Sequence, residues 1–369
     1  MNLSRKILLI FIFTVAPCFV QGFAQASMNT PQCKAFQDYI QGAGDPTNGL
    51  QTDGLVVMKD GAIRYEYYDK YYSSTTPHCL WSVSKSITSA LLGTAVLDNK
   101  ISLDEPLNRY FPASSRKTSG PNEPLYNNIK ISDLLEMGSG LKWIEDYEST
   151  VQTSSVISML YLKGRGNMAE FALNSSMRPE GPGGIWNYSS GDTNILMGVL
   201  KKIYGSQYDA LPWHNVFNPI GMRGVVFEKD DSGAYVGAAY VHSTPREMTK
   251  FGQLYMGDGV WQGKRLLPEG WVKMSRTVSN ALLAKGTSTD EIISEGVYGR
   301  GFWLNQRVRD LPLPFPNSPE DMFFAAGHFG QLIIMIPSRG LILTRTGHDN
   351  EYWSKIDPMV SKALACFTD

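Results

Sequence analysis

The sequence predicts an α+β fold: an α/β sandwich whose antiparallel sheet is flanked by helices, together with a helical domain. Strand-like runs gather near the two chain ends, at about residues 50–80 and 295–369. Between about residues 100 and 231 the pattern is helical, with many Gly, Pro, Ser and Asn breaks. Strands at both ends indicate a sheet assembled from the two termini, with a helical insertion packed against it. No repeat or low-complexity linker interrupts residues 27–369, so we expect one rigid body.

The first 26 residues are predicted to be a signal peptide. Arg5 and Lys6 precede an apolar run from about residue 7 to 20, and Ala24-Gln25-Ala26 has the small residues of a cleavage site. The run is shorter than the roughly 18 to 20 residues that span a bilayer, and Pro17 interrupts it. Cleavage after Ala26 is therefore favoured over retention as an anchor, and we expect a periplasmic or secreted protein.

Charge and motifs argue against several kinds of partner. Loss of Arg5 and Lys6, two positive charges, moves the formal net charge from −1 to −3, and no long run of either sign follows. Nothing therefore predicts binding to nucleic acid, or to a membrane once the signal is cleaved. No HExxH or CxxC motif is present, and His242 and His348 each stand alone. We expect neither a metal nor another cofactor.

Three cysteines remain after cleavage: Cys33, Cys79 and Cys366. An oxidising compartment permits one disulfide and leaves one thiol. Cys33 and Cys366 lie near opposite ends of the mature chain, and the termini of a domain are often close in space. We predict that these two pair, and that Cys79 is a small buried residue rather than a nucleophile.

The first elements follow from turn signals and periodicity. Gly54–Lys59 and Ala62–Tyr68 read as strands, and Asp60-Gly61 between them is a strong hairpin signal. A helix then begins near Ser82, because apolar residues recur at every fourth position from Val83 to Ala95.

Later elements are read from caps and strand patterns. Asp192 is predicted to cap a helix that Gly205 ends. Thr244-Pro245-Arg246-Glu247 reads as a capping box with proline at the first helical position. The remaining candidates are the strands Gly299–Asn305, Met322–Ala326, Gln331–Ile336 and Leu341–Thr346, and a final helix at about Asp357–Cys366.

Trp81-Ser82-Val83-Ser84-Lys85-Ser86 places a serine hydroxyl and a lysine amine three residues apart at the head of the first helix. Positions i and i+3 share one helix face, so the lysine nitrogen can reach the serine oxygen. The free N–H groups of the first turn point the same way. This is the local geometry of a serine nucleophile served by a lysine base.

Two other serine–lysine pairs have the same spacing, Ser114 with Lys117 and Ser139 with Lys142. Ser114 lies in a polar loop, and Ser139 lies between two glycines in a turn signature. Only Ser82 has a helix behind it to hold it in place, so context selects Ser82.

Two later segments supply further candidates. Tyr188 lies in a polar turn and is a partner for Lys85, whose pKa must fall from about 10.4 for it to act as a base. In Ala325–Gln331, which reads as an edge strand, His328 precedes Gly330, where something approaches the backbone closely. Taken alone, such a tyrosine is more often a packed ring, and a histidine at a strand end is usually structural.

Taken together, the segments resemble a known superfamily. Serine-x-x-lysine, then tyrosine-x-polar about a hundred residues on, then a basic residue-x-glycine on a late strand is the order of serine β-lactamases and penicillin-binding proteins. The sequence looks most like the branch with class C β-lactamases, D-Ala-D-Ala carboxypeptidases, family VIII-type esterases and 6-aminohexanoate-dimer hydrolases. Ile131–Leu141, Pro219–Met222 and Gly263–Pro268 are also similar in kind and order. The resemblance covers the mature chain and implies a β-lactamase/DD-peptidase-like fold.

The chain departs from the β-lactamase pattern at two places. Ser190 stands where β-lactamases have asparagine, and His328-Phe329-Gly330 stands where they have lysine-threonine/serine-glycine. A histidine is mostly neutral at pH 7, and phenylalanine offers no hydroxyl. Both changes weaken recognition of an anion and favour a neutral or apolar ester or amide.

The resemblance implies a set of roles for these residues. Ser82 would be the nucleophile, with Lys85 and Tyr188 as the acid/base pair, and the oxyanion would bind the backbone N–H groups of Ser82 and Gln331. Residues expected to orient the substrate or to line its side of the site are Ser190, His328, Gly330, Trp143, Glu145 and Trp186.

The function expected from the sequence is that of an exported serine hydrolase that cleaves an ester or amide bond through an acyl-enzyme on Ser82. Its substrate would be a small-molecule ester or amide, or a peptide-like compound. The alternatives are a non-catalytic, penicillin-binding-like ligand sensor, and a β-lactamase or D-Ala-D-Ala peptidase.

Overall fold

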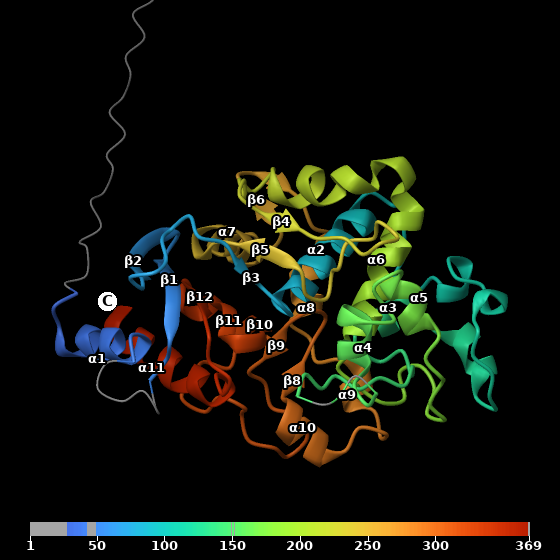
Figure 1. Ribbon diagram of the computed structural model, residues 1–369. Coiled ribbons are helices and arrows are strands. Elements are labelled where there is room, and N and C mark those ends of the chain that lie inside the picture. Colours follow the sequence, from blue (N-terminus) through green and yellow to red (C-terminus); the bar gives the residue numbers. More distant parts are fainter. Residues whose placement is uncertain (1–27, 43–48, 149, 151, 368–369) are drawn as a thin grey trace, which may run out of the picture.

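The computed structural model describes residues 28–42, 49–148, 150 and 152–367. The expected signal peptide, residues 1–26, lies outside this part of the chain. Within the described part, no helix is both long enough and apolar enough to cross a membrane. The sheet occupies one half of the molecule in Figure 1, and helices coloured cyan to yellow-green occupy the other half.

A seven-stranded antiparallel sheet joins the two ends of the chain, in the order β2-β1-β12-β11-β10-β9-β8. The expectation of a sheet built from both termini is confirmed, because β1 and β12, the second and third strands in this order, are hydrogen-bonded neighbours. Its strands are β1 Thr52–Lys59, β2 Ala62–Tyr68, β8 Val297–Tyr298, β9 Trp303–Leu304, β10 Phe323–Gly327, β11 Gln331–Ile336 and β12 Leu341–Gly347.

Helices cover both faces of this sheet. Gly54 of β1 lies against Pro245 of helix α7, whereas Val57 pairs with Tyr65, which packs on Phe36 of helix α1. Residues three apart on a strand point to opposite faces, so α7 and α1 lie on opposite sides. The chain therefore forms the predicted sandwich. Its helices are α1 Pro31–Ile40, α2 Val83–Leu97, α3 Ile131–Leu135, α4 Ser155–Tyr161, α5 Met168–Leu173, α6 Ser190–Tyr204, α7 Pro245–Met256, α8 Trp271–Ser275, α9 Asn280–Leu283, α10 Thr289–Glu295 and α11 Ile356–Phe367.

The two small sheets and the helical half complete the scaffold around α2. Helix α6 packs against α2, α3 and α5, and α2 in turn reaches β10 and β11 of the large sheet. The remaining strands are β3 His78–Cys79, β4 Val226–Phe227 and β5 Val241–Ser243 in one small sheet, and β6 Val260–Trp261 and β7 Lys264–Arg265 in another.

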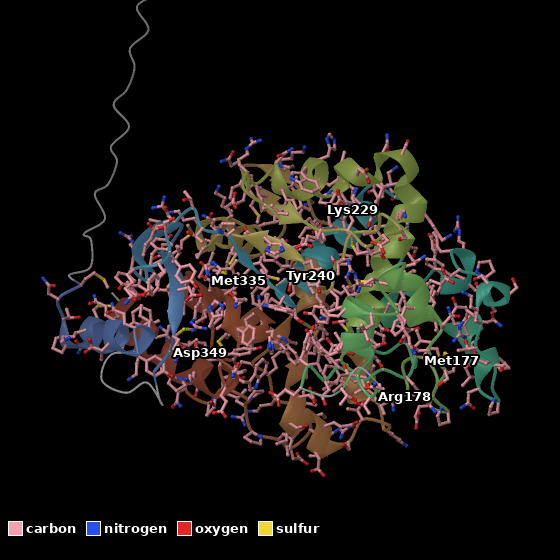
Figure 2. The ribbon with its side chains drawn as sticks, in the orientation of Figure 1. Met177, Arg178, Lys229, Tyr240, Met335 and Asp349 are labelled. Carbon is pink, nitrogen blue, oxygen red and sulfur yellow. A yellow bond between two sulfur atoms is a disulfide. The ribbon has the colours of Figure 1, made fainter. Side chains whose placement is uncertain are left out.

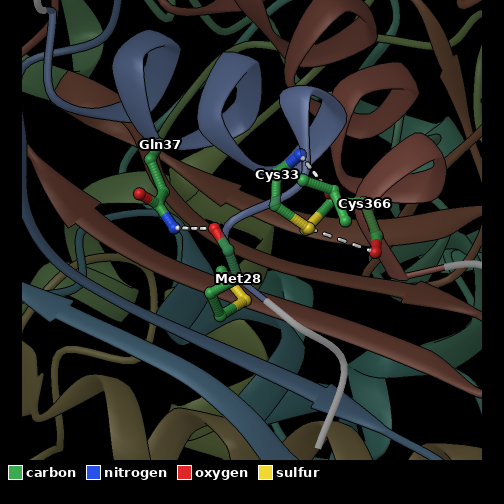
Figure 3. Close-up of a disulfide and its surroundings, with 5 residues drawn as sticks. Met28, Cys33, Gln37 and Cys366 are labelled. Carbon is green, nitrogen blue, oxygen red and sulfur yellow. Dashed lines mark hydrogen bonds between the residues drawn. A yellow bond between two sulfur atoms is a disulfide. The ribbon is translucent and has the colours of Figure 1, made fainter.

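A disulfide joins Cys33 of α1 to Cys366 of α11, as predicted (Figure 3). Near this bond, the Gln37 side chain donates to the Met28 carbonyl, which ties the start of the described chain to α1. Cys79 keeps a free thiol, and burial raises its pKa to about 11. Such a thiol is not a nucleophile at neutral pH.

Four expected features differ from the structure. The helix cap is Ser189 rather than Asp192: the Ser189 side chain accepts from the Asp192 N–H. Thr244 caps α7 as expected, but Glu247 accepts from the backbone of Arg223 and Gly224 instead of closing a capping box.

The predicted strand Gly299–Asn305 is a hairpin of two short strands, β8 and β9. Gly301 has φ +87°, a left-handed conformation that ends a strand and that glycine adopts without strain. The segment 325–331 is likewise not one strand, because β10 stops at Gly327 and residues 328–330 form a turn.

Candidate active site

Ser82 sits at the N-terminus of α2 behind a strained residue. Trp81 has φ +49°, which is uncommon for a bulky side chain and typically costs about 1–3 kcal/mol. Its ring is held by the rings of Tyr147, Tyr240, His328 and Phe329, with centroids 5.4–6.5 Å away. Figure 2 places Tyr240 near the centre of the molecule, between the sheet and the helical half. The packing around Trp81 therefore fixes the point at which the chain turns into Ser82.

Lys85 is 2% exposed, and its ammonium lies one turn behind Ser82. Nζ is 2.9 Å from Ser82 Oγ, 2.8 Å from Ser190 Oγ and 3.2 Å from the Ala238 carbonyl oxygen. The i, i+3 geometry expected from the sequence is thus present, and Ser190 reaches the same nitrogen from the start of α6.

The direction of these hydrogen bonds follows from their partners. Ser190 Oγ lies 2.5 Å from a carboxylate oxygen of Glu145, so its single proton points to Glu145 and it accepts from Lys85. The Ala238 carbonyl can only accept. When Lys85 is neutral, its two N–H bonds go to these partners, and its lone pair faces Ser82. Glu145 thereby sets the orientation that a general base requires.

Glu145 is itself held by three residues. It accepts from the Ser190 backbone N–H at 2.9 Å and from Trp143 Nε1 at 2.6 Å, and it lies 3.7 Å from Lys85 Nζ. Burial lowers the pKa of Lys85 from its ordinary value to about 8, while the Glu145 carboxylate acts in the opposite direction. A substantial fraction of Lys85 is therefore neutral at slightly alkaline pH.

Tyr188 borders the same centre. Lys85 Nζ lies 4.8 Å from the centre of the Tyr188 ring. Burial is the main cause that raises the pKa of Tyr188 well above 10, and the nearby Tyr298 is the second. A hydrogen bond with Ser82 opposes this rise. Tyr188 therefore keeps its proton across the neutral range and is a donor rather than a base.

A cavity of about 250 Å³ opens in front of Ser82. It is lined mostly by aromatic rings and carries two carboxylates. The lining residues are Ser82, Glu145, Tyr147, Tyr188, Ser294, Glu295, Trp303, Ala326, His328, Tyr352 and Trp353. Aromatic walls with a few polar groups are typical of small-molecule sites.

His328 lies at the edge of this cavity, in the turn between β10 and β11. Its ring stacks on Tyr147 at 5.1 Å and contacts Phe329. Burial lowers the pKa of His328 below its usual value, with Glu148 opposing, so the ring is neutral at pH 7. His328 thus supplies no fixed positive charge.

Gly330 is required by the close approach of a buried cation. It has φ +81°, and a side chain there would meet the Arg345 guanidinium and, at 3.0 Å, Tyr352. Arg345 donates to the Gly330 carbonyl at 2.8 Å and pairs with Asp349, which Figure 2 labels. The close backbone approach expected at Gly330 is confirmed, and it serves to hold the turn.

The structure brings Gly327, rather than Gln331, beside the Ser82 backbone. A Cβ on Gly327 would lie 3.2 Å from the Ser82 nitrogen and would also meet the Leu80 carbonyl. Gln331 pairs with Gly327 from the next strand, and its side chain bonds the Gly347 carbonyl at 2.7 Å. The role of the Gln331 N–H as oxyanion donor stays a prediction, and residues 326–328 offer a second candidate donor beside Ser82.

The other serine–lysine pairs have separate explanations. Ser114 is exposed, and Ser139 is buried, where it donates to Asp192 at 2.8 Å. Of the residues expected on the substrate side, Glu145 lines the cavity, whereas Trp143 and Trp186 are buried behind it. Sequence reasoning missed Tyr147, Glu295, Trp303, Tyr352 and Trp353, which no motif marks.

The sequence model of the β-lactamase family matches residues 36–352, which is most of the chain and includes every residue of this site except Trp353. The chain belongs to the β-lactamase family. As a member of this family of serine hydrolases, it has the local geometry expected for a serine nucleophile with a lysine base.

Among known relatives, this β-lactamase-family chain is similar to the 6-aminohexanoate-dimer hydrolase of Paenarthrobacter ureafaciens, with 25% identity over 270 residues. That match covers 70% of this chain but only 65% of the relative, so the chain matches just under two thirds of that protein's length. It is also similar to a putative D-alanyl-D-alanine carboxypeptidase of Salmonella typhimurium, 20% identical, covering 92% of this chain and 83% of the relative.

Solved structures agree on the fold. A putative 6-aminohexanoate-dimer hydrolase from Bacillus anthracis superposes with a TM-score of 0.66 at 20% identity, covering 85% of this chain and 79% of that one. EstCE1, a hydrolase with promiscuous acyltransferase activity, superposes with a TM-score of 0.70 at 16% identity, covering 91% and 98%. The β-lactamase/DD-peptidase-like fold expected from the sequence is confirmed.

Proposed function

We propose that the protein is an exported serine hydrolase that cleaves a neutral or apolar ester or an amide through an acyl-enzyme on Ser82. The observation that carries this proposal is the buried Lys85, whose lone pair can face only Ser82 Oγ. Family membership supports hydrolase chemistry. The Cys33–Cys366 disulfide supports an oxidising compartment, and hence export of the chain.

In the proposed mechanism, Ser82 Oγ attacks the carbonyl carbon while its proton moves to Lys85 Nζ. The oxyanion binds the Ser82 N–H and an N–H from residues 326–328, beside which Ser82 lies. Tyr188, which retains its proton, donates to the leaving group and is reprotonated from Lys85. A water molecule, activated by Lys85, then hydrolyses the acyl-enzyme along the reverse route.

The charge of the cavity bears on the substrate. Among the residues that the structure describes, its lining contains two carboxylates and no Arg or Lys. Recognition of a substrate carboxylate, as in a β-lactam or a D-alanyl peptide, calls for a fixed cation at the site. The neutral His328 does not supply one. These features support a neutral ester or amide over a β-lactam, and Glu145 at the cavity wall further disfavours an anion.

The test is acylation of Ser82 by p-nitrophenyl acetate and butyrate, followed by intact mass and release of p-nitrophenol. Ser82→Ala should abolish turnover and labelling by a serine-directed phosphonate, and Lys85→Ala should lower kcat/KM by at least ~10³-fold. The control is Ser114→Ala with Lys117→Ala, an exposed pair of the same spacing, which should leave kcat/KM unchanged.

Two outcomes would count against the proposal. Turnover like that of the wild type in Ser82→Ala or Lys85→Ala would rule out the assigned roles, and absence of any acyl-enzyme would favour a non-catalytic ligand sensor. Nitrocefin and D-alanyl peptides belong in the same panel. Faster turnover of either would show that the substrate is anionic rather than a neutral ester or amide.

A further inference from the structure

The cavity in front of Ser82 carries negative charge that the protein leaves partly unbalanced. Of its two carboxylates, Glu145 is engaged by Ser190, Trp143 and Lys85. Glu295 is different, because it is exposed at the cavity wall and the charged groups that act on it, Glu145 and Glu291, are both acidic. This carboxylate faces the substrate space rather than a basic side chain of the cavity lining.

The position of Glu295 in its helix is electrostatically unfavourable. It is the last residue of α10, where the free carbonyl groups of the final turn give a partial negative charge. Glu291 lies one turn earlier on the same helix face, and like charges at this spacing repel. Although the residue is exposed, neighbouring groups at the cavity remove part of the water around its carboxyl group; this desolvation, then Glu145 and Glu291, raises the pKa of Glu295. A cation placed beside Glu295 would relieve all of these interactions.

Aromatic rings line the same cavity as this carboxylate and lie beside the next residue in the chain. Gly296, the residue after Glu295, has φ +99°, and a side chain there would lie 3.1 Å from the Trp353 ring and 3.5 Å from the Trp303 ring. The two indoles pack at 5.0 Å, and Trp303 packs on Tyr188 at 5.1 Å. The faces of Trp and Tyr attract cations, most strongly where water is partly excluded. Glu295, Trp303 and Trp353 line the same cavity, and both kinds of side chain attract an ammonium group.

We propose that the substrate of this hydrolase carries a cationic ammonium group, which binds between the Glu295 carboxylate and the Trp303 and Trp353 rings while the scissile carbonyl lies at Ser82. This inference rests on the proposed function, since it names a property of the ester or amide that Ser82 attacks. Glu295 is then a specificity-determining residue, and it acts by charge.

The test uses pairs of esters that differ only in charge. Acetylcholine and 3,3-dimethylbutyl acetate place the quaternary nitrogen or its carbon replacement on the alcohol side. The p-nitrophenyl esters of 4-(trimethylammonio)butanoate and 5,5-dimethylhexanoate place it on the acyl side. In at least one pair, kcat/KM should favour the cation by about three- to thirty-fold. The preference should shrink in about 1 M salt, where charges are screened within about 3 Å.

Glu295→Gln should lower this cation-to-neutral ratio about three- to ten-fold. Asp290→Asn is the matched control, because it removes an equal charge from the same helix at an exposed site that does not line the cavity. The control should leave the ratio unchanged. If the cation-to-neutral ratio fell equally in both variants, the effect of Glu295 would come from the overall charge of the protein, and the inference would be overturned.

The two proposals fail in distinguishable ways. If Ser82 is acylated by the neutral esters and neither pair favours the cation, the inference is wrong and the proposed function stands. If no ester acylates Ser82, the proposed function is wrong. The inference is then decided by calorimetric binding of choline and 3,3-dimethylbutanol to Ser82→Ala: tighter binding of choline supports the ammonium site, and equal affinity overturns it.

Discussion

Among single residues, Lys85 is the one on which the proposed activation of Ser82 depends. In that mechanism the neutral amine is the base, and burial lowers the pKa of Lys85 to about 8. We therefore expect kcat/KM for an uncharged ester to rise with pH and to be half-maximal near pH 8. Tyr188 keeps its proton beyond pH 10, so no fall is expected between these values. A pH–rate profile that is flat across pH 8 would contradict Lys85 as the base.

A second residue-level prediction concerns Glu145. Glu145→Gln keeps an acceptor oxygen for Ser190 but removes the charge that raises the pKa of Lys85. The half-maximal pH of kcat/KM should move to lower pH, by about one unit. Glu148→Gln, three residues away and exposed, is the control that should leave the half-maximal pH in place. A lower rate with an unmoved profile would indicate a purely structural role for Glu145.

For single residues, the sequence predicts the contacts that the geometry of one helix determines. Ser82 and Lys85 meet because residues three apart on a helix share a face, and Ser190 joins them from the first residue of α6. Glu295 and Trp353 reach the cavity from the end of α10 and from the stretch before α11. Their positions depend on packing between distant segments, and no short motif records that packing.

Among the elements, the hairpin of β10 and β11 places His328 and the backbone beside Ser82. Its turn depends on Gly330, which has φ +81° and lies against Arg345. Gly263, in the turn between β6 and β7, has the same φ with open space around it. Alanine at either site costs about 1–2 kcal/mol of backbone strain, but only at Gly330 must it also displace a buried guanidinium.

Gly330→Ala should therefore lower the free energy of unfolding by about 1–3 kcal/mol more than Gly263→Ala. Urea unfolding of the two variants measures this difference. Equal losses in the two variants would show that Arg345 does not constrain the turn.

Turn residues explain which elements the sequence predicts well. The hairpin of β1 and β2 is recognised because Asp60 and Gly61 both adopt positive φ, as the Asp-Gly signal requires. The pattern of residues 299–305 predicts one continuous strand, because nothing in it marks the positive φ of Gly301 that separates β8 from β9. The sequence predicts Asp192 as the cap of α6, although Ser189 three residues earlier offers an equally suitable side chain.

For the whole molecule, the Cys33–Cys366 disulfide joins the first and last described helices. A cross-link over 333 residues restricts the unfolded chain strongly, and removal of such bonds typically costs about 2–4 kcal/mol. Cys33→Ala with Cys366→Ala should lower Tm by about 3–8 °C. Reductant should lower Tm of the wild type similarly and leave the double variant unchanged. Cys79→Ala is the control for loss of a free thiol. If reductant lowered Tm equally in the wild type and in the double variant, the assignment of the Cys33–Cys366 disulfide would be contradicted.

The pairing of β1 with β12 also has a consequence for how the protein folds. Thr52 pairs with Gly347, so an inner seam of the sheet joins the start and the end of the chain. Contacts between residues this far apart in sequence close large loops and slow folding. The sheet cannot be completed until nearly the whole chain has been synthesised, so we expect truncation within β12 to yield no native sheet. The scaffold of the active site is thus formed late, when the chain ends meet.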